Sequence, residues 1–369
     1  MTSTAPVESS SHPATASLAA AIPALPSVDA LIQPHIDAAI DALGDPAGLM
    51  SLMARYHLGQ IDADGQPATP EVMRASQGKR LRPAVALLSC AAAGGDQRQA
   101  APVAAAIELL HQFTLIHDDI QDVSPTRRHR PTVWKIWGVG QAINAGDAMH
   151  ATAHLALYRL ADTGVDVGLA MALAGNYDRM TIEIVRGQVR DLGFEGRDGV
   201  TPDDYLDMIS GKTSAIIRYA AMAGARIAGA DAGTAEAFAR FGLALGIGFQ
   251  IQDDMLGIWG AAERTGKAAA DDIRRRKQSL PILLLRSAAD GPERLLLDDL
   301  YHGPEIDEAG VNQVLKLLDG YGIRSLVEHR VQTYHDEARD CLLAAARAGD
   351  NPGRDALLQM VDQLAVRDH

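Results

Sequence analysis

Apolar residues at helical spacing dominate the chain from about residue 27 onward. The longest candidate helices span about residues 100–123, 133–162, 167–193, 233–256 and 322–347. Clusters such as Gly44–Pro46 and Gly94–Gly95 separate the apolar segments, and glycine and proline end helices or form turns. We find neither an alternating strand pattern of useful length nor a repeat of fixed period. The pattern therefore predicts an all-α protein built as a single large helical bundle.

Composition supports the helical prediction. Aromatic residues make up only 4% of the 369 residues, and this balance favours close-packed helices over sheets. The length allows one large domain. Ser, Thr, Ala and Pro dominate residues 1–26, a composition that buries too little apolar surface to fold. We therefore expect a disordered N-terminal tail over residues 1–26 and a single domain over residues 27–369.

Charge and cysteine content limit the binding partners and the cellular location that we expect for the protein. A formal net charge of -13 argues against a nucleic-acid or anionic-membrane partner. Cys90 and Cys341 form no CxxC pair, so we expect neither a disulfide framework nor a thiolate metal site. The first Lys or Arg is Arg55, which argues against a signal or transit peptide, and no uninterrupted apolar run reaches the roughly 18 residues of a membrane span. We expect a cytoplasmic protein without stable membrane insertion.

The strongest local motif is LIHDDIQD, which follows an apolar helical segment. Asp118, Asp119 and Asp122 fall at positions i, i+1 and i+4, so Asp118 and Asp122 share a helix face. At a helix C-terminus the dipole disfavours negative charge. Mg²⁺ is a suitable counterion because it takes oxygen ligands and is completed by water and substrate phosphates. The alternative is a solvated acidic helix end.

A second acidic pair, Asp253 and Asp254, ends another apolar run in GFQIQDD. Two such helix ends facing one cavity could hold several metal ions around one diphosphate. The metal ions would neutralise the leaving group as its C–O bond breaks. Taken alone, the second pair is more simply a helix end that reaches solvent, and its pairing with the first motif favours the metal site.

Fixed positive charge is concentrated in four short clusters of an otherwise acidic chain. These clusters are Lys79, Arg80 and Arg82; Arg127 and Arg128; Lys212 with Thr213; and Lys267 with Arg274, Arg275, Arg276 and Lys277. Arg offers two parallel bonds to phosphate and Lys a point charge. We expect Lys212 at a helix start, where free backbone N–H groups also favour an anion. Each cluster alone could be a solvated surface, but the four together indicate phosphate binding.

These motifs together resemble a known family. GKRLRP, ELLHQFTLIHDDIQD, RRHRPTVW, AGDAMHA, GQVRDL, GKTS, GFQIQDD and GKAAADDIRRRKQSLP occur in the order typical of trans-isoprenyl diphosphate synthases, the polyprenyl synthetase family. The resemblance covers the chain from about residue 30 and is nearest to geranylgeranyl diphosphate synthases. It implies an isoprenoid-synthase bundle around a central apolar cavity, and a homodimer. The implied reaction is a Mg²⁺-dependent condensation of isopentenyl diphosphate with dimethylallyl, geranyl or farnesyl diphosphate.

The resemblance also implies roles for individual residues. Those expected to hold the isopentenyl diphosphate are Lys79, Arg82, His111 and Arg128. Those expected to contact the allylic diphosphate or to line its site are Arg127, Lys212, Thr213, Gln250, Lys267 and Lys277, with Gln188 and Asp191 nearby. The expected metal ligands are Asp118, Asp119, Asp122 and Asp253, and these four together with Lys212 are the expected catalytic residues.

Two positions depart from the family pattern. The second motif reads DDMLG, so Gly257 replaces a third carboxylate. The loss removes one possible metal ligand but keeps Asp253, and we expect Gly257→Asp to be tolerated or mildly activating. After the first motif, RRG becomes RRH, with His129 and Arg130 before Pro131.

Product length is expected to depend on Phe113. It lies five residues before Asp118, about 7.5 Å along the helix at 1.5 Å per residue, and the neighbouring Thr114 is small. The resemblance makes Phe113 the floor of the product tunnel and favours a C20 product, with C15 as the alternative. Phe113 could instead only pack between helices.

Two other functions fit parts of the pattern. A class I terpene cyclase uses the same ionisation but needs no second diphosphate site, so GKRLRP and His111 argue against it. Its NxxxSxxxE motif is also missing, since Asn176 is followed at that spacing by Met180 and Ile184. A non-catalytic subunit of a heteromeric synthase is suggested only by Gly257.

Overall fold

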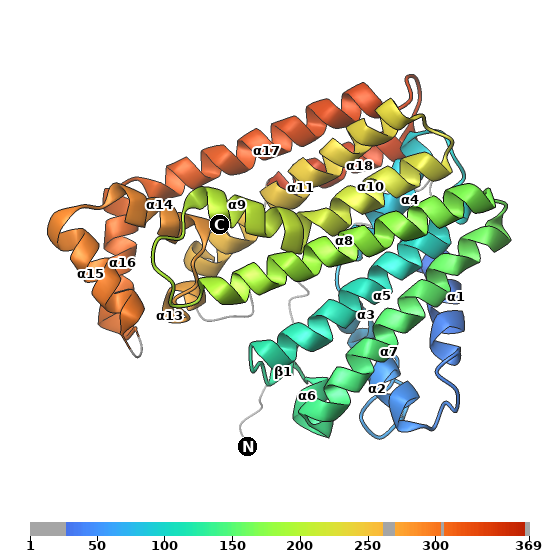
Figure 1. The fold of residues 1–369 in the computed structure, drawn as a ribbon, viewed down its shortest axis with the longest axis horizontal. Coiled ribbons are helices and arrows are strands. Elements are labelled where there is room, and N and C mark those ends of the chain that lie inside the picture. The colour runs from blue at the N-terminus through green and yellow to red at the C-terminus, as the bar shows by residue number, and fades with distance from the viewer. Residues whose placement is uncertain (1–26, 261–269, 304–305, 366–369) are drawn as a thin grey trace, which may run out of the picture.

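A computed structural model describes residues 27–260, 270–303 and 306–365, which form a bundle of helices (Figure 1). The predicted all-α fold is confirmed. In this part of the chain the one sheet is a hairpin of two short antiparallel strands, β1 (Thr126–Arg127) and β2 (Arg130–Pro131). No helix within these residues is long and apolar enough to cross a membrane. The proposed tail and Lys267 lie outside the described residues, so the domain boundary stays a prediction.

Helices follow one another closely along the chain. The first half consists of α1 (Val28–Asp41), α2 (Leu49–His57), α3 (Pro70–Gln77), α4 (Leu81–Ala92), α5 (Gln97–Gln121), α6 (Val133–Trp137), α7 (Val139–Tyr158) and the 3₁₀ turn η3 (Arg159–Thr163). The second half consists of α8 (Val167–Phe194), α9 (Pro202–Ile209), the π-type turn η4 (Ser210–Ser214), α10 (Ala215–Ile227), α11 (Ala232–Trp259), α13 (Asp271–Arg274), α14 (Leu280–Ala288), α15 (Gly291–His302), α16 (Glu308–Gly320), α17 (Ile323–Ala345) and α18 (Pro352–Ala365). The single helix predicted over 133–162 is wrong, because Gly138 adopts a φ of +83° and separates α6 from α7.

Small residues bring the central helices into close contact. A Cβ atom added at Gly224 of α10 would lie 2.1 Å from the carbonyl oxygen of Ala86 on α4. One added at Gly242 of α11 would lie 2.6 Å from the carbonyl oxygen of Ile217 on α10. No side chain fits at either contact, so the abundance of Gly and Ala in the sequence reflects close helix packing.

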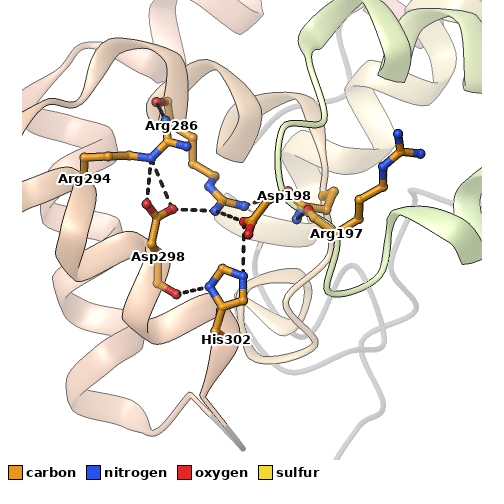
Figure 2. A network of polar contacts seen from close by, with 7 residues as sticks. Arg197, Asp198, Arg286, Arg294, Asp298 and His302 are labelled. Carbon is orange, nitrogen blue, oxygen red and sulfur yellow. Dashed lines mark hydrogen bonds and ion pairs between the residues drawn. The ribbon is translucent and has the colours of Figure 1, made fainter.

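A polar network fixes the connection between α8 and α9 to the C-terminal helices (Figure 2). The buried Arg286 on α14 donates to Asp298 on α15 at 2.5 Å and to Asp198 at 3.5 Å. Beside it, the side chain of Gln278 donates to the carbonyl oxygen of Arg197 at 3.3 Å. These contacts hold α14 and the segment just before it against the connection that follows α8.

Candidate active site

The first acidic motif forms the C-terminal end of α5. Asp118 and Asp119 lie in its last turn, and Asp122 is the C-cap residue, whose N–H donates to the carbonyl oxygen of Asp118 at 2.8 Å. Asp119 is buried, Asp118 is half-buried and Asp122 is exposed. Burial raises the pKa of Asp118 and raises the pKa of Asp119 to about 6. Because burial disfavours the charged carboxylates, a nearby cation is needed to stabilise them.

Arg127 on β1 supplies a positive charge to one of them. Its Nε donates to both carboxylate oxygens of Asp119, at 2.9 and 3.1 Å, and its Nη2 lies 2.9 Å from Oδ1. In the described part of the chain, no hydrogen bond reaches the carboxylate of Asp118 or Asp122. The structure therefore pairs a predicted metal ligand with a predicted phosphate ligand and leaves Asp118 and Asp122 as oxygen donors on one helix face.

The two acids of the second motif lie at the end of α11 and differ in their exposure to solvent. Asp253 is exposed, whereas Asp254 is 1% exposed. Asp254 accepts hydrogen bonds from Tyr205 at 2.6 Å, Gln250 at 3.1 Å and Lys277 at 2.8 Å. Asp254 therefore joins α11 to α9 through Tyr205 and to the segment after α13 through Lys277. Gln250 bonds the same carboxylate from within α11. Of the two acids, Asp253 is the one whose carboxylate is exposed and could bind a metal ion.

The structure explains why position 257, in the second motif, is a glycine. A Cβ atom added at Gly257 would lie 2.3 Å from Oδ2 and 2.6 Å from Cγ of Asp272. Asp272, on α13, is 5% exposed, and its carboxylate lies 3.8 Å from the Lys277 ammonium group. An acid from α13 thus occupies the space beside position 257. These contacts lead to the opposite prediction, that Gly257→Asp destabilises the protein, because the new side chain would overlap a buried carboxylate of the same charge.

Side chains from α8 and η4 lie between the two acidic motifs. Lys212 in η4 forms an ion pair with Asp191 on α8. Gln188 on α8 donates to Gln121 at the end of α5, at 2.7 Å. Thr213 donates to the side chain of Gln250 on α11, at 2.8 Å. These contacts place Lys212 between α5 and α11, and its charge lowers the pKa of Asp118, against the larger effect of burial.

The predicted helix start at Lys212 is wrong. The elements α9, η4 and α10 follow one another without a break, so the residue lies inside a continuous helical segment. A Cβ atom added at Gly187 of α8 would lie 2.2 Å from the backbone nitrogen of Lys212. Gly187 is therefore needed for the close approach of α8 to η4, and a π-type turn at this point is a feature frequent at functional sites.

Arg82, His111 and Arg128 lie close together and form a group that we call the basic cradle. Nη1 of Arg82 lies 3.3 Å from Nε2 of His111. Burial and then the charges of Arg82 and Arg128 lower the pKa of His111 well below its ordinary value, so the imidazole is neutral. Burial lowers the pKa of Arg82, whereas the charges of Glu108 and then Asp253 favour its charged form. The cradle and the second acidic motif therefore interact electrostatically.

The remaining members of the first basic cluster differ in burial. Lys79 is exposed in the loop between α3 and α4. Arg80 is buried, adopts a φ of +49°, and lies 2.7 Å from the buried carboxylate of Glu108. Glu108 also accepts a hydrogen bond from Gln112 at 2.5 Å. Arg80 and Glu108 therefore form a buried ion pair that stabilises the fold.

The structure adds a residue that sequence reasoning missed. His57 lines a pocket beside the hairpin, together with Ser76, Gln112, Arg127 and Arg128. Burial and the charges of Arg127 and Arg128 lower the pKa of His57 to about 3. A lone histidine at the end of a helix carries no distinctive sequence pattern, so only its place in the fold identifies it.

Phe113 points from α5 toward α7. Its ring centroid lies 4.8 Å from that of His117 and 5.0 Å from that of His150 on α7. Thr114 donates to the carbonyl oxygen of His111 at 2.8 Å. The floor assignment stays a prediction, and the same geometry also fits simple packing between α5 and α7.

The carboxylates suit Mg²⁺ as separate donors. Within residues 27–260, 270–303 and 306–365, no group of three or more His, Cys, Asp and Glu side chains is arranged to hold a metal ion. Asp118 and Asp122 share one helix face, and Asp253 is exposed at the end of another helix. Because Mg²⁺ needs only one or two carboxylates when substrate phosphates and water complete its coordination, these residues fit that ion.

Known proteins share this sequence and arrangement. The polyprenyl synthetase family matches residues 69–318. A geranylgeranyl diphosphate synthase of Mycobacterium tuberculosis (strain ATCC 25618 / H37Rv) is 43% identical over 272 residues, 73% of this chain and 74% of that protein. A (2E,6E)-farnesyl diphosphate synthase of Mycobacterium bovis is 41% identical over 261 residues, 71% of this chain and 69% of that protein. The crystal structure of a polyprenyl synthetase from Streptomyces coelicolor A3(2) has a TM-score of 0.81 and 34% identity, covering 92% of this chain and 98% of that one. The chain therefore belongs to the polyprenyl synthetase family and is a trans-prenyltransferase.

Proposed function

We propose that the protein joins isopentenyl diphosphate head-to-tail to an allylic diphosphate in a Mg²⁺-dependent reaction that gives a short all-trans prenyl diphosphate. One observation carries this proposal. Acidic helix ends on α5 and α11 and a separate basic cradle of Arg82, His111 and Arg128 offer two chemically different diphosphate sites. One site suits a diphosphate held through metal ions, and the other a diphosphate held by protein cations.

Each group then has a role in the condensation. Bound Mg²⁺ supplies charge neutralisation for the departing diphosphate. Asp118, Asp122 and Asp253 hold the ion, and Lys212 contacts the allylic diphosphate. The cradle orients the isopentenyl double bond toward the allylic carbon, and apolar helix faces exclude water from the cation. The proton is lost to the departing diphosphate, so no side chain acts as the general base.

The two alternatives lose support in the structure. A terpene cyclase has no use for a second diphosphate site, whereas the cradle brings two half-buried arginines, Arg82 and Arg128, together beside His111. The hypothesis of a non-catalytic subunit rested only on Gly257. The carboxylate of Asp272 occupies the space beside this residue, which gives the glycine a structural explanation.

A C20 product is the specific proposal for chain length. Phe113 lies on α5 below the first motif and packs against His117 and His150, so its ring can limit the depth of the tunnel. Relatives named as geranylgeranyl and as farnesyl diphosphate synthases are similarly close, which keeps C15 as the alternative.

We also propose a homodimer that buries the exposed apolar face of α7 and α8. Large apolar side chains on α8 recur at helical spacing and are at least 36% exposed; they are Ile182, Val185, Val189 and Leu192. On α7, Leu155 and Tyr158 are also exposed. Contiguous apolar surface of this kind marks a protein interface. The cytoplasmic location stays a prediction from cysteine content.

Product analysis tests the function directly. Purified protein, Mg²⁺ and isopentenyl diphosphate are incubated with dimethylallyl, geranyl or farnesyl diphosphate, and the dephosphorylated products are separated by chromatography. Geranylgeraniol from all three primers is expected, and farnesol as the end product would establish C15. A hydrocarbon formed without isopentenyl diphosphate would show a cyclase instead, and activity that appears only with a second protein would show a subunit.

A further inference from the structure

The hairpin that carries Arg127 and Arg128 is not stable by itself. Its strands contain two residues each, and its two-residue turn consists of Arg128 and His129 with φ values of +50° and +63°. Positive φ at both turn residues is typical of type I′ turns, which strongly prefer Gly or Asn. A two-stranded ribbon is at best marginally stable in water. Contacts outside the hairpin must therefore hold this turn in place.

Arg130 makes several of those contacts. Its Nη1 donates to the carbonyl oxygen of Tyr56 at 3.0 Å and to Oγ of Ser76 at 3.1 Å. Its Nη2 donates to the carbonyl oxygen of Ile61 at 2.9 Å. The guanidinium group also lies 4.0 Å above the Tyr56 ring, and the Tyr56 hydroxyl donates to the carbonyl oxygen of Pro131 at 2.8 Å. We call this pair of side chains the Tyr56–Arg130 clamp.

The clamp determines where Arg128 lies. Arg128 donates to the carbonyl oxygen of Ser76, the same residue that Arg130 holds through its hydroxyl. A Cβ atom added at Gly78 would lie 2.7 Å from Nη2 of Arg128, so this guanidinium packs directly against the loop that carries Lys79. The hairpin and the GKRLRP loop are thus joined through a segment that Arg130 holds at several points.

Arg127 depends less on the clamp. It has its own contacts, because Nε and Nη2 bond the carboxylate of Asp119 on α5. Loss of Arg130 should therefore displace Arg128 more than Arg127. Arg128 is assigned to isopentenyl diphosphate and Arg127 to the allylic substrate. Loss of Arg130 should therefore weaken the binding of isopentenyl diphosphate more than that of the allylic substrate.

We propose that Arg130 is a positioning residue for isopentenyl diphosphate, acting through the Tyr56–Arg130 clamp on Arg128. Both of its terminal nitrogens bond protein oxygens, which assigns it an indirect role. The proposal rests on the proposed function, because it presupposes two diphosphate sites.

Substrate kinetics of Arg130→Met test the proposal. The KM for isopentenyl diphosphate should rise roughly 10- to 100-fold, since a displacement of about 1 Å can cost about 100-fold. The KM for the allylic diphosphate should change by less than about threefold. Arg130→Lys should give an intermediate rise, because one ammonium group cannot replace the planar fork. Tyr56→Phe removes the bond to Pro131 and should shift the same KM less. Its effect should not add fully to that of Arg130→Met, since both side chains hold one hairpin.

Arg294 provides the matched control. It bonds Asp298 at 3.1 Å and the carbonyl oxygen of Arg286, and it belongs to the network on α14 and α15, away from the hairpin (Figures 1 and 2). Arg294→Met should lower the melting temperature and leave both KM values unchanged. Equal changes in both KM values for Arg130→Met, or the same change for Arg294→Met, would show a general structural role and overturn the proposal. If Arg130→Met does not fold, Arg130→Lys and Tyr56→Phe give the same comparison. A wild-type enzyme that forms no elongated product would refute the proposed function instead.

Discussion

Gly257 is the position where the structure makes the sharpest prediction. In Gly257→Ala the new Cβ would lie 2.3 Å from Oδ2 of Asp272, closer than any stable contact. Asp272 is 5% exposed and cannot move into solvent without leaving Lys277. Overpacking of this kind costs about 1 to 3 kcal/mol, and the helix gains about 0.5 to 1 kcal/mol when Ala replaces Gly. We expect a net loss of about 0 to 2.5 kcal/mol.

Gly257→Asp should be worse than Gly257→Ala. It adds a second carboxylate beside Asp272, and two like charges about 4 Å apart repel by about 4 kcal/mol at an effective dielectric of 20. The melting temperature, read by circular dichroism, should fall at about 2 to 4 °C per kcal/mol. Mg²⁺-dependent turnover should fall with it, because Asp272 and Asp254 share Lys277.

A glycine with free space and a double variant give the controls. Gly320, at the end of α16, has no atom within 4 Å of an added Cβ, so Gly320→Ala should be neutral or stabilising. Adding Asp272→Gly to Gly257→Asp should recover stability, because it removes the overlap and the repulsion together. Wild-type stability and activity in Gly257→Asp would refute this reasoning.

Four further predictions concern the site. Asp118→Ala and Asp253→Ala should each lower turnover by several orders of magnitude in a Mg²⁺ titration while the fold is kept. Asp254→Ala should instead lower stability by about 1 to 3 kcal/mol, because it leaves the buried Tyr205 hydroxyl and the Gln250 amide without their acceptor. Lys79→Ala and Arg82→Ala should raise the KM for isopentenyl diphosphate more than that for the allylic substrate, and equal effects would contradict the assignment of both residues to isopentenyl diphosphate. Phe113→Ala should give products longer than wild type on chromatography. An unchanged product with a stability loss of about 3 to 5 kcal/mol would show that Phe113 only packs.

The helical fold could be predicted because apolar periodicity is a local property. The prediction of a single helix over residues 133–162 failed at Gly138 for a physical reason. Apolar residues continue on both sides of Gly138, so the periodicity gives no sign of one residue with a positive φ. The clamp could not be predicted at all. Tyr56 and Arg130 are 74 residues apart, and nothing in either segment indicates the other. Contacts of that kind depend on how whole helices pack.

The two acidic motifs show how much of a site is encoded locally. Neighbouring residues on a helix point about 100° apart, so a DD pair cannot direct both acids into one site. On α11 the buried residues Ile251, Met255 and Ile258 define the core face, and Asp254 lies on it while Asp253 lies outside it. Helical phase therefore identifies the acid that faces the site, and this signal was available in the sequence. The partner of the buried acid was not available, because Lys277 reaches Asp254 from a separate segment beyond α13. Local periodicity thus predicts which carboxylate can bind a metal ion, and only the tertiary structure shows which cation makes the other one stable in the core.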